Sequence, residues 1–194
     1  GDAVRMFSAE SDSVRELRMF VKNMARKVRS DAKPPTGNQN CMLCTWCVEM
    51  WFRGGDEMPR PVYSPTDPIF QYDGYEFVKG AKKMSFKDKK DFLVKIKSEG
   101  EGARFYVHVN WLGRQSGHEF VVANIGGKSY LVDGQAGFCD KVESNAASIY
   151  FMVNWSNCFA MRIDGKEINE NVVKLNEKKY IKQLSEEDMK ILNS

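Results

Sequence analysis

Strict two-residue alternation in the second half of the chain restricts the fold more than any other feature. Every second residue of the stretch 104–111 is apolar: Phe105, Val107, Val109 and Trp111. This period of two is typical of a β-strand. Two further apolar runs, 119–125 and 129–132, flank Gly126-Gly127, a dipeptide that favours a tight hairpin. The second half is therefore predicted to be an antiparallel sheet, with 149–153 and 159–163 as a further pair of strands.

The first part of the chain has helical spacing instead. Apolar residues recur every three or four positions between 14 and 28, and Ser13 with Glu16 forms a capping box that predicts where this helix begins. Pro34-Pro35 must end it, because proline cannot continue a helix. Helices that precede a sheet along the chain are typical of an α+β domain.

Two more helices are expected before the sheet. The composition from Cys44 to Phe52 is apolar and is broken at Gly54-Gly55, which indicates a buried helix. Another helix is expected over 85–98, where Ser85 and Asp88 form a second capping box.

Two segments between these helices and the sheet have unusual composition. Four prolines between Met58 and Pro68 exclude regular structure there, and a loop of this length often lines a cleft. Residues 79–97 contain eight lysines and two aspartates. A solvated helix face is the ordinary explanation, and contact with an acidic partner or anionic lipid is the alternative.

Length and composition limit the domain count and the classes of partner. With 194 residues, 42% of them apolar, the chain can bury a core as one domain overall, in which a helical segment 1–33 precedes a main domain 34–194. The net charge of +3 demands no nucleic-acid partner. No apolar run approaches the ~20 residues that span a bilayer. A start at Gly1 without a signal peptide is expected for one domain of a larger polypeptide, and a short helix from Ser185 is expected to close the chain.

Cysteine is the first residue type that can carry chemistry here. The chain has five cysteines, three of them crowded at Cys41, Cys44 and Cys47, which favours a reducing place of action over a disulfide framework. Cys41 follows the polar loop 36–40 and is predicted in the first turn of a helix. Free N–H groups and the helix dipole stabilise a thiolate there, lower its pKa and help to hold an oxyanion. Cys44 and Cys47 are expected to be buried and inert.

Histidine supplies the base, and the chain has two, His108 and His118. His118 begins one strand of the predicted hairpin and Asp133 ends the other, so the turn returns both to the same end of the sheet. Asp133 can then hold the imidazole in the tautomer that accepts the thiol proton. Glu119 is a poorer partner, because adjacent strand residues point to opposite faces. His108 is expected to be an ordinary hydrogen-bonded histidine, which leaves Cys41, His118 and Asp133 as the predicted catalytic triad.

Three polar residues beside the triad are predicted to bind the oxyanion or the substrate. Gln39 and Asn40 precede the nucleophile, and Gln135 follows Asp133 by two positions. Thiol catalysis by such residues is expected to need no metal and no cofactor.

The order of these blocks resembles the papain-fold toxin family. Asn40-Cys41-x-x-Cys44 leads into a helix that ends Phe52-Arg53-Gly54-Gly55, and a proline-rich loop, a strand, Gly117-His118, a hairpin and Asp133-Gly134-Gln135 follow. Members of this family occur at the ends of bacterial polymorphic toxins and in phage head-associated proteins, and a related fold forms glutamine-deamidase domains of large bacterial toxins. The resemblance covers roughly residues 38–163. It implies a papain-like α+β fold with the nucleophile on a helix and the base on an antiparallel sheet.

The resemblance also implies roles and partners. Cys41, His118 and Asp133 would form the triad of a papain-like catalytic domain with a protein as substrate and a cognate immunity protein as a further partner. The parent would be a secreted or virion-associated bacterial or phage protein acting in a reducing cytoplasm.

The cysteine cluster leaves two alternatives open. Cys44 competes as the nucleophile, because Cys-x-x-Cys followed closely by tryptophan resembles the papain neighbourhood in which the second cysteine reacts. A zinc or iron–sulfur site is the other alternative, although structural zinc needs four ligands and Cys139 or Cys158 would have to complete the set.

Two classes of function remain. The first is a cysteine-nucleophile hydrolase of a protein amide, either a glutamine deamidase or a peptidase, which differ only in the leaving group. The second is a non-catalytic papain-like module that binds a partner or helps to assemble a virion.

Overall fold

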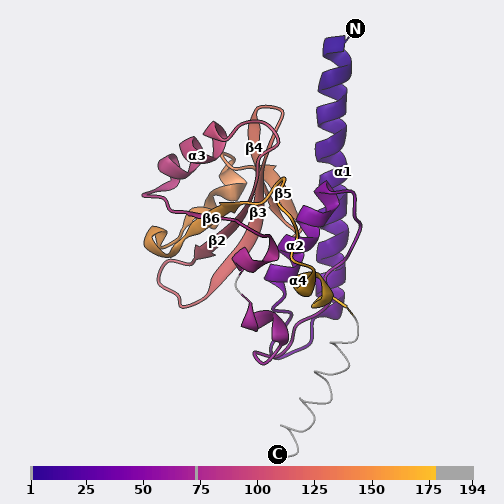
Figure 1. Ribbon diagram of the computed structural model, residues 1–194, viewed down its shortest axis with the longest axis vertical. Coiled ribbons are helices and arrows are strands. Elements are labelled where there is room, and N and C mark those ends of the chain that lie inside the picture. Colours follow the sequence, from indigo (N-terminus) through magenta and orange to yellow (C-terminus); the bar gives the residue numbers. More distant parts are fainter. Residues whose placement is uncertain (1, 73, 178–194) are drawn as a thin grey trace, which may run out of the picture.

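The computed structural model describes residues 2–72 and 74–177. Its centre is a six-stranded antiparallel sheet with the strand order β1-β6-β2-β3-β4-β5 (Figure 1). The strands are β1 Lys83–Met84, β2 Arg104–Asn110, β3 Gly117–Ile125, β4 Lys128–Asp133, β5 Phe138–Lys141 and β6 Phe159–Arg162. The α-helices are α1 Asp2–Asp31, α2 Cys41–Phe52, α3 Lys89–Ser98 and α4 Glu170–Lys174. The expected α+β class is confirmed.

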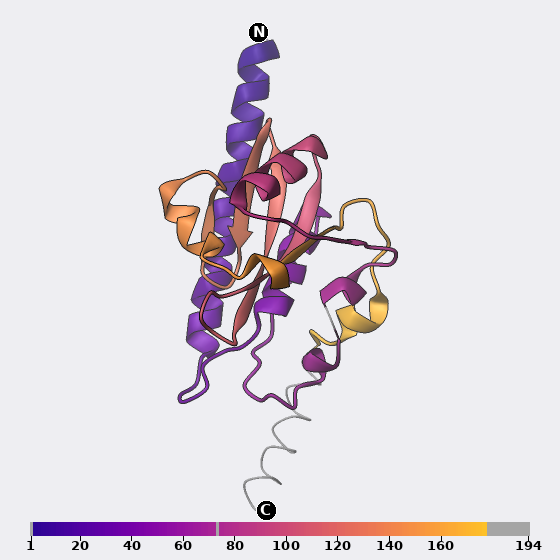
Figure 2. The same cartoon turned by 90° about the vertical axis from the view of Figure 1, so that its left-hand side faces the viewer.

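Helices cover both faces of the sheet (Figures 1 and 2). Val121 and Ala123 of β3 belong to a buried cluster with α1 and α2, whereas Phe120 and Val122 belong to a second cluster with α3 and the 3-10 helix η3 (Asn145–Phe151). We call the two sides of the sheet the α2 face and the α3 face. Because side chains alternate along a strand, the odd-numbered residues of β3 point to the α2 face and the even-numbered ones to the α3 face.

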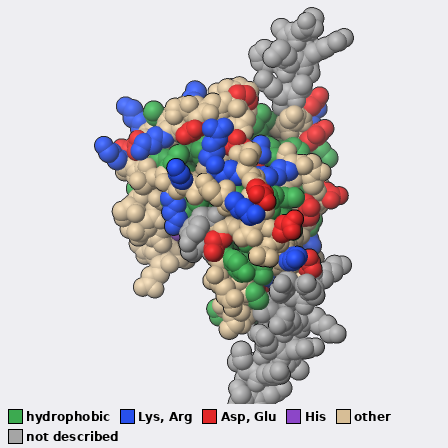
Figure 3. All heavy atoms as spheres, viewed as in Figure 1, with side chains coloured by type: hydrophobic (Ala, Val, Ile, Leu, Met, Phe, Trp, Pro, Cys, Tyr) green, Lys and Arg blue, Asp and Glu red, His purple; other side chains and the backbone are tan. Residues whose placement is uncertain are grey.

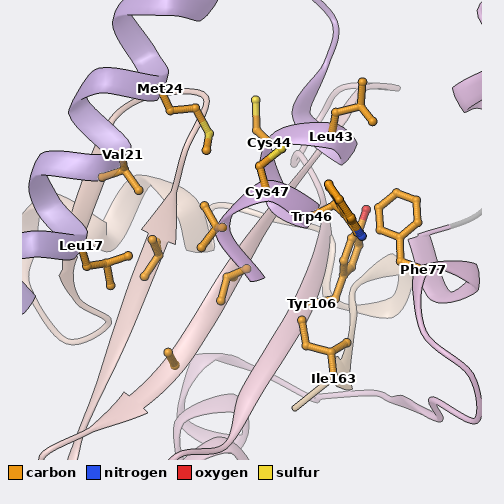
Figure 4. Close-up of a cluster of buried hydrophobic side chains, with 14 of the residues drawn as sticks. Leu17, Val21, Met24, Leu43, Cys44, Trp46, Cys47, Phe77, Tyr106 and Ile163 are labelled. Carbon is orange, nitrogen blue, oxygen red and sulfur yellow. The ribbon is translucent and has the colours of Figure 1, made fainter. Parts of the chain in front are cut away.

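The core on the α2 face explains the helical spacing of the first segment. Leu17, Val21 and Met24 of α1 are fully buried, and Figure 4 shows them directed toward Cys44 and Cys47 of α2. Burial of each aliphatic side chain contributes about 1.5–3 kcal/mol. The apolar positions predicted for this helix are therefore confirmed, and α1 shares one buried cluster with α2 and the sheet.

β3 and β4 form the predicted hairpin around Gly126-Gly127, both with positive φ. The ladder ends with Val121 opposite Val132, and β4 itself ends at Asp133. The chain leaves the sheet at Gly134, where an added Cβ would lie 2.3 Å from Met24 Sδ. Glycine therefore allows the turn after β4 to pass close to α1, and beyond this point β3 is paired with β2 and no longer with β4.

Two predicted helix starts are wrong. α1 runs from Asp2, so Ser13 and Glu16 lie inside the helix and form no start. α3 begins at Lys89, and its N-cap is Asp88, whose side chain accepts a hydrogen bond from the N–H of Asp91. Phe86 explains the later start, because this buried side chain packs edge-on against Phe92 and keeps the preceding segment outside the helix.

The predicted strand pair 149–153 with 159–163 is also wrong. Residues 145–151 form η3, and β6 pairs with β1 and β2 instead. Ala147 and Tyr150 of η3 are both buried and lie three positions apart, which fits a 3-10 helix and does not fit the period of a strand. The helix expected from Ser185 lies outside the described residues.

The surface around α3 is rich in basic side chains. Of the eight lysines between 79 and 97, all except Lys89 are exposed, and Figure 3 shows lysine and arginine side chains gathered over this part of the molecule. Within the described ranges, no helix combines the length and the apolar composition needed to cross a membrane.

The proline-rich segment lacks regular structure from 57 to 64, as predicted, and a buried ion pair holds it in place. Arg60 binds both carboxylate oxygens of Asp67, at 2.6 and 2.7 Å, and its Nε donates to the carbonyl of Leu175. Both side chains are at most 2% exposed. The side-chain oxygen of Asn176 accepts a hydrogen bond from the backbone N–H of Arg60, so the segment is held against the residues that follow α4.

Loss of this pair should destabilise the fold strongly. Arg60→Ala leaves the Asp67 carboxylate buried and uncompensated, and we expect a loss of about 3–5 kcal/mol in the free energy of unfolding, measured by urea titration. Lys79→Ala, which removes the exposed pair with Glu167, is the control and should leave the midpoint unchanged. Equal midpoints for both variants would contradict a structural role of Arg60.

Candidate active site

Cys41 is the first residue of α2, and the loop before it is firmly held. The N–H of Gln39 donates to the carbonyl of Val62 at 2.8 Å, and Asn40 donates from its side chain to the carbonyl of Arg60 at 2.9 Å. The first helical bond runs from the N–H of Cys44 to the carbonyl of Asn40. The proline-rich segment thus fixes where α2 begins, and the N–H groups of its first turn, including that of Cys41, have no intrahelical acceptor.

The sulfur of Cys41 lies at the open end of the β3–β4 ladder. Along the β2–β3 ladder, hydrogen-bonded residue pairs alternate with pairs that are not hydrogen-bonded. Asn124 with Ala103 and Trp111 with Ser116 are hydrogen-bonded, so Glu119 belongs to a pair that is not. The N–H of Glu119 therefore points away from β2 and toward β4. β4 has ended at Asp133, and the Cys41 sulfur accepts this N–H in place of a strand. The thiol therefore sits level with the sheet, next to the residue that follows His118.

His118 and Asp133 are brought together on the α3 face, as predicted. The distance from His118 Nε2 to Asp133 Oδ2 is 2.7 Å, with the side chains 13% and 2% exposed. Tyr150 of η3 donates its hydroxyl to the same carboxylate oxygen at 2.7 Å. The other oxygen accepts the N–H groups of Gln135 and Ala136. Four hydrogen-bonding groups thus contact one buried carboxylate, which fixes its orientation.

This contact fixes the tautomer of His118. A carboxylate only accepts hydrogen bonds, so Nε2 carries the proton and Nδ1 of the neutral ring is the free base. The ring of Trp111 stacks on the imidazole with centroids 6.1 Å apart, and the Tyr150 ring, tilted by 33°, lies with its centroid 6.3 Å away. The imidazole is therefore held in one orientation with one basic nitrogen.

A second imidazole–carboxylate pair lies on the α2 face. His108 Nδ1 is 3.2 Å from Glu119 Oε1, and Tyr106 donates its hydroxyl to the other carboxylate oxygen. Phe159 stacks on the His108 ring with centroids 5.0 Å apart. Glu119 thus points away from His118, as the alternation predicted, and orients the other histidine.

The second pair borders a cleft of about 280 Å³. Besides His108 and Glu119, its walls include Met42, which follows Cys41, and the aromatic rings of Phe70, Tyr72 and Phe159. Through Met42, this cleft adjoins the first turn of α2, one residue along the chain from Cys41.

The expected lowering of the Cys41 pKa is wrong. Burial and the nearby carboxylates of Glu119 and Asp133 raise the pKa of this thiol above its ordinary value of 9.0, against the opposing effect of the Glu119 and Met42 N–H groups. The prediction counted the helix terminus and left out desolvation and the carboxylates. Cys41 is therefore a thiol at rest, and a base must take its proton during attack.

Two of the residues predicted to bind oxyanion or substrate are engaged elsewhere. The side chain of Gln135 donates to the carbonyl of Asn38 and to Asn40 Oδ1. Asn40 is 1% exposed, and its Oδ1 also accepts a hydrogen bond from the thiol of Cys44. Both amides thus hold the nucleophile loop in place, whereas Gln39, two residues before Cys41, is exposed.

The alternative uses of the cysteine cluster find little support in the geometry. Cys44 and Cys47 are at most 1% exposed in the core on the α2 face, and burial raises the pKa of both thiols. All five cysteines are unpaired. Among the described residues, no three His, Cys, Asp or Glu side chains are grouped so that they could hold a metal ion.

Two parts of the site were missed by sequence reasoning. Tyr150 falls in the predicted strand 149–153, and its spacing of three positions from Ala147 is the sequence signal for a 3-10 helix. The His108–Glu119 pair was also missed, although its members alternate in phase with buried Tyr106 and Val121.

Comparison with protein-family models, with curated proteins and with solved structures gives no match for this chain. The site is therefore interpreted from its own geometry.

The accessibility and raised pKa of Cys41 predict its reactivity. Iodoacetamide should modify Cys41 before the buried Cys44 and Cys47, and the rate should still be rising at pH 9, because a raised pKa delays formation of the thiolate. Peptide mapping after timed alkylation measures both. A rate that levels off below pH 7, or earlier labelling of Cys44, would contradict this description.

Proposed function

We propose that the protein is a papain-like cysteine hydrolase that acts on an amide of another protein. Cys41 is the nucleophile, His118 the base and Asp133 the carboxylate that orients it. The observation that carries the proposal is the buried 2.7 Å contact between His118 and Asp133, one residue along β3 from the N–H that binds the Cys41 sulfur.

Acylation follows from this arrangement. The Cys41 sulfur attacks the amide carbon while its proton passes to Nδ1 of His118, and Asp133 stabilises the imidazolium that forms. The imidazolium then protonates the leaving nitrogen. The free N–H of Cys41 at the start of α2 is placed to stabilise the oxyanion, and the exposed side chain of Gln39 is a second donor. The raised thiol pKa requires this coupled transfer, because no standing thiolate is available.

The substrate class follows from the same residues and from the resemblance to papain-fold toxin domains. A carboxamide side chain releases ammonia and a peptide bond releases an amine, and His118 protonates either group. Under this proposal the domain is an effector that acts on a protein in a reducing compartment, and five unpaired cysteines are compatible with that setting. A cognate immunity protein would cover the cleft.

The non-catalytic binding module is the second candidate, and the raised pKa of Cys41 is the observation that favours it. A scaffold kept for binding needs no reactive thiol. The two candidates differ in whether Cys41 forms a covalent intermediate.

The triad predicts a graded set of losses. Cys41→Ala should abolish turnover, and His118→Ala should lower it by about 10²–10⁴-fold or more, because the thiol loses its base. Asp133→Asn should cost less, since the base remains and only its tautomer and orientation are disturbed. Asp140→Asn, on the neighbouring strand β5, is the matched control and should keep full activity.

Mass spectrometry of a cell lysate treated with each variant provides the readout. Conversion of a carboxamide to a carboxylate in one protein would indicate deamidation, and new termini would indicate proteolysis. Lysates that wild type and Cys41→Ala leave identical would refute the hydrolase and favour the binding module.

A further inference from the structure

The carboxylates of two imidazole–carboxylate pairs lie near enough to Cys41 to raise the pKa of its thiol, and the proposed acylation uses one of these pairs. His118 and Asp133 lie on the α3 face, and His108 and Glu119 lie on the α2 face. Glu119 links the second pair to the nucleophile directly, since its N–H binds the sulfur while its side chain binds His108.

The orientation of His108 is as well defined as that of His118. Its Nδ1–H donates to Glu119, so Nε2 of the neutral ring is basic and lies on the far side of the ring from that carboxylate. Gly117 leaves the space for the ring, because a Cβ there would lie 3.2 Å from His108 Cε1 and 2.5 Å from the carbonyl oxygen of Val109. Tyr106 and Phe159 fix the carboxylate and the ring from two other sides.

Access to water distinguishes the two histidines. The side chain of His118 is 13% exposed and is covered by Trp111 and Tyr150, whereas that of His108 is 30% exposed and forms part of the cleft wall. An acyl group on the sulfur would present one side to His118 and the other to this cleft. The cleft is bordered by Met42 and His108, so water can approach Nε2 of His108 from a side that the aromatic cover of His118 does not occupy.

We propose that His108, oriented by Glu119, is the base that activates water for hydrolysis of the acyl-enzyme, while His118 serves acylation. This role rests on the proposed function, and it assigns acylation to the α3 face of the sheet and hydrolysis of the acyl-enzyme to the α2 face. The contacts that carry it are the Nδ1 bond of His108 to Glu119, the N–H of Glu119 on the sulfur, and the cleft that joins Met42 to His108.

The proton and electron balance closes with water as the only co-reactant. The water oxygen bonds to the thioester carbon as its proton passes to Nε2 of His108, and Glu119 stabilises the imidazolium. The carbon–sulfur bond then breaks, and sulfur leaves with the electron pair. The His108 imidazolium returns the proton to sulfur, which yields a carboxylic acid, the Cys41 thiol and neutral His108.

Burst kinetics with p-nitrophenyl acetate separate the two steps. Wild type should release one p-nitrophenolate per chain in a burst and then turn over steadily. His108→Gln, which keeps a hydrogen-bonding side chain toward Glu119, should keep the burst and lose about 100-fold in the steady rate. Intact mass spectrometry should show an acetyl group accumulating on Cys41, and added imidazole should restore the steady rate of His108→Ala. His118→Ala should lose the burst itself.

The outcomes distinguish this role from the proposed function. A full burst with equal steady rates in wild type and His108→Gln would overturn the second base and leave the hydrolase standing. No burst and no acetyl adduct in wild type would overturn both. Melting temperatures of the variants establish that each is folded, and Glu119→Gln, which weakens the orientation of His108, should give a smaller loss in the same direction.

Discussion

The departure of the chain from the sheet at Gly134 is the constraint on which the site depends. A Cβ on this residue would lie 2.3 Å from Met24 Sδ, so glycine lets the chain pass this close to α1 where β4 ends at Asp133 and β3 continues beside β2. The N–H of Glu119 then lacks a strand partner, and the sulfur at the start of α2 takes that place. A ladder one pair longer would fill the position of the nucleophile with backbone. Packing of α1 and α2 against the turn therefore creates the reactive position.

The electrostatics of the site follow from the same geometry. A sulfur in the plane of a sheet lies close to side chains from both faces, and here each face contributes a carboxylate. Both carboxylates disfavour a thiolate, and each is hydrogen-bonded to an imidazole. The site thus disfavours negative charge on the resting nucleophile, which suits proton transfer that is concerted with bond formation.

Contacts between residues distant in sequence could be predicted where a local signal fixes the register of two strands. Gly126-Gly127 sets the hairpin, and the hairpin places Asp133 near His118. Prediction failed where tertiary contacts decide: Phe86 delays the start of α3, and Tyr150 requires a 3-10 helix to reach Asp133. It failed for the Cys41 pKa for the same reason, since desolvation and charges on two strands have no signature near the cysteine. The papain-like arrangement and the catalytic roles stay predictions.

The buried Arg60 gives the nucleophile loop a mechanical connection to the distant end of the described chain. Its carbonyl accepts a hydrogen bond from the side chain of Asn40, and its guanidinium donates one to the carbonyl of Leu175, so one residue couples positions that are 135 apart in sequence. Displacement of Leu175, which follows α4, would remove a hydrogen-bond acceptor from the buried Arg60 guanidinium. It would also loosen the loop before Cys41, because Asn40 is bonded to the carbonyl of Arg60. The geometry around Cys41 thus depends on the position of Leu175 and Asn176, more than 130 residues further along the chain.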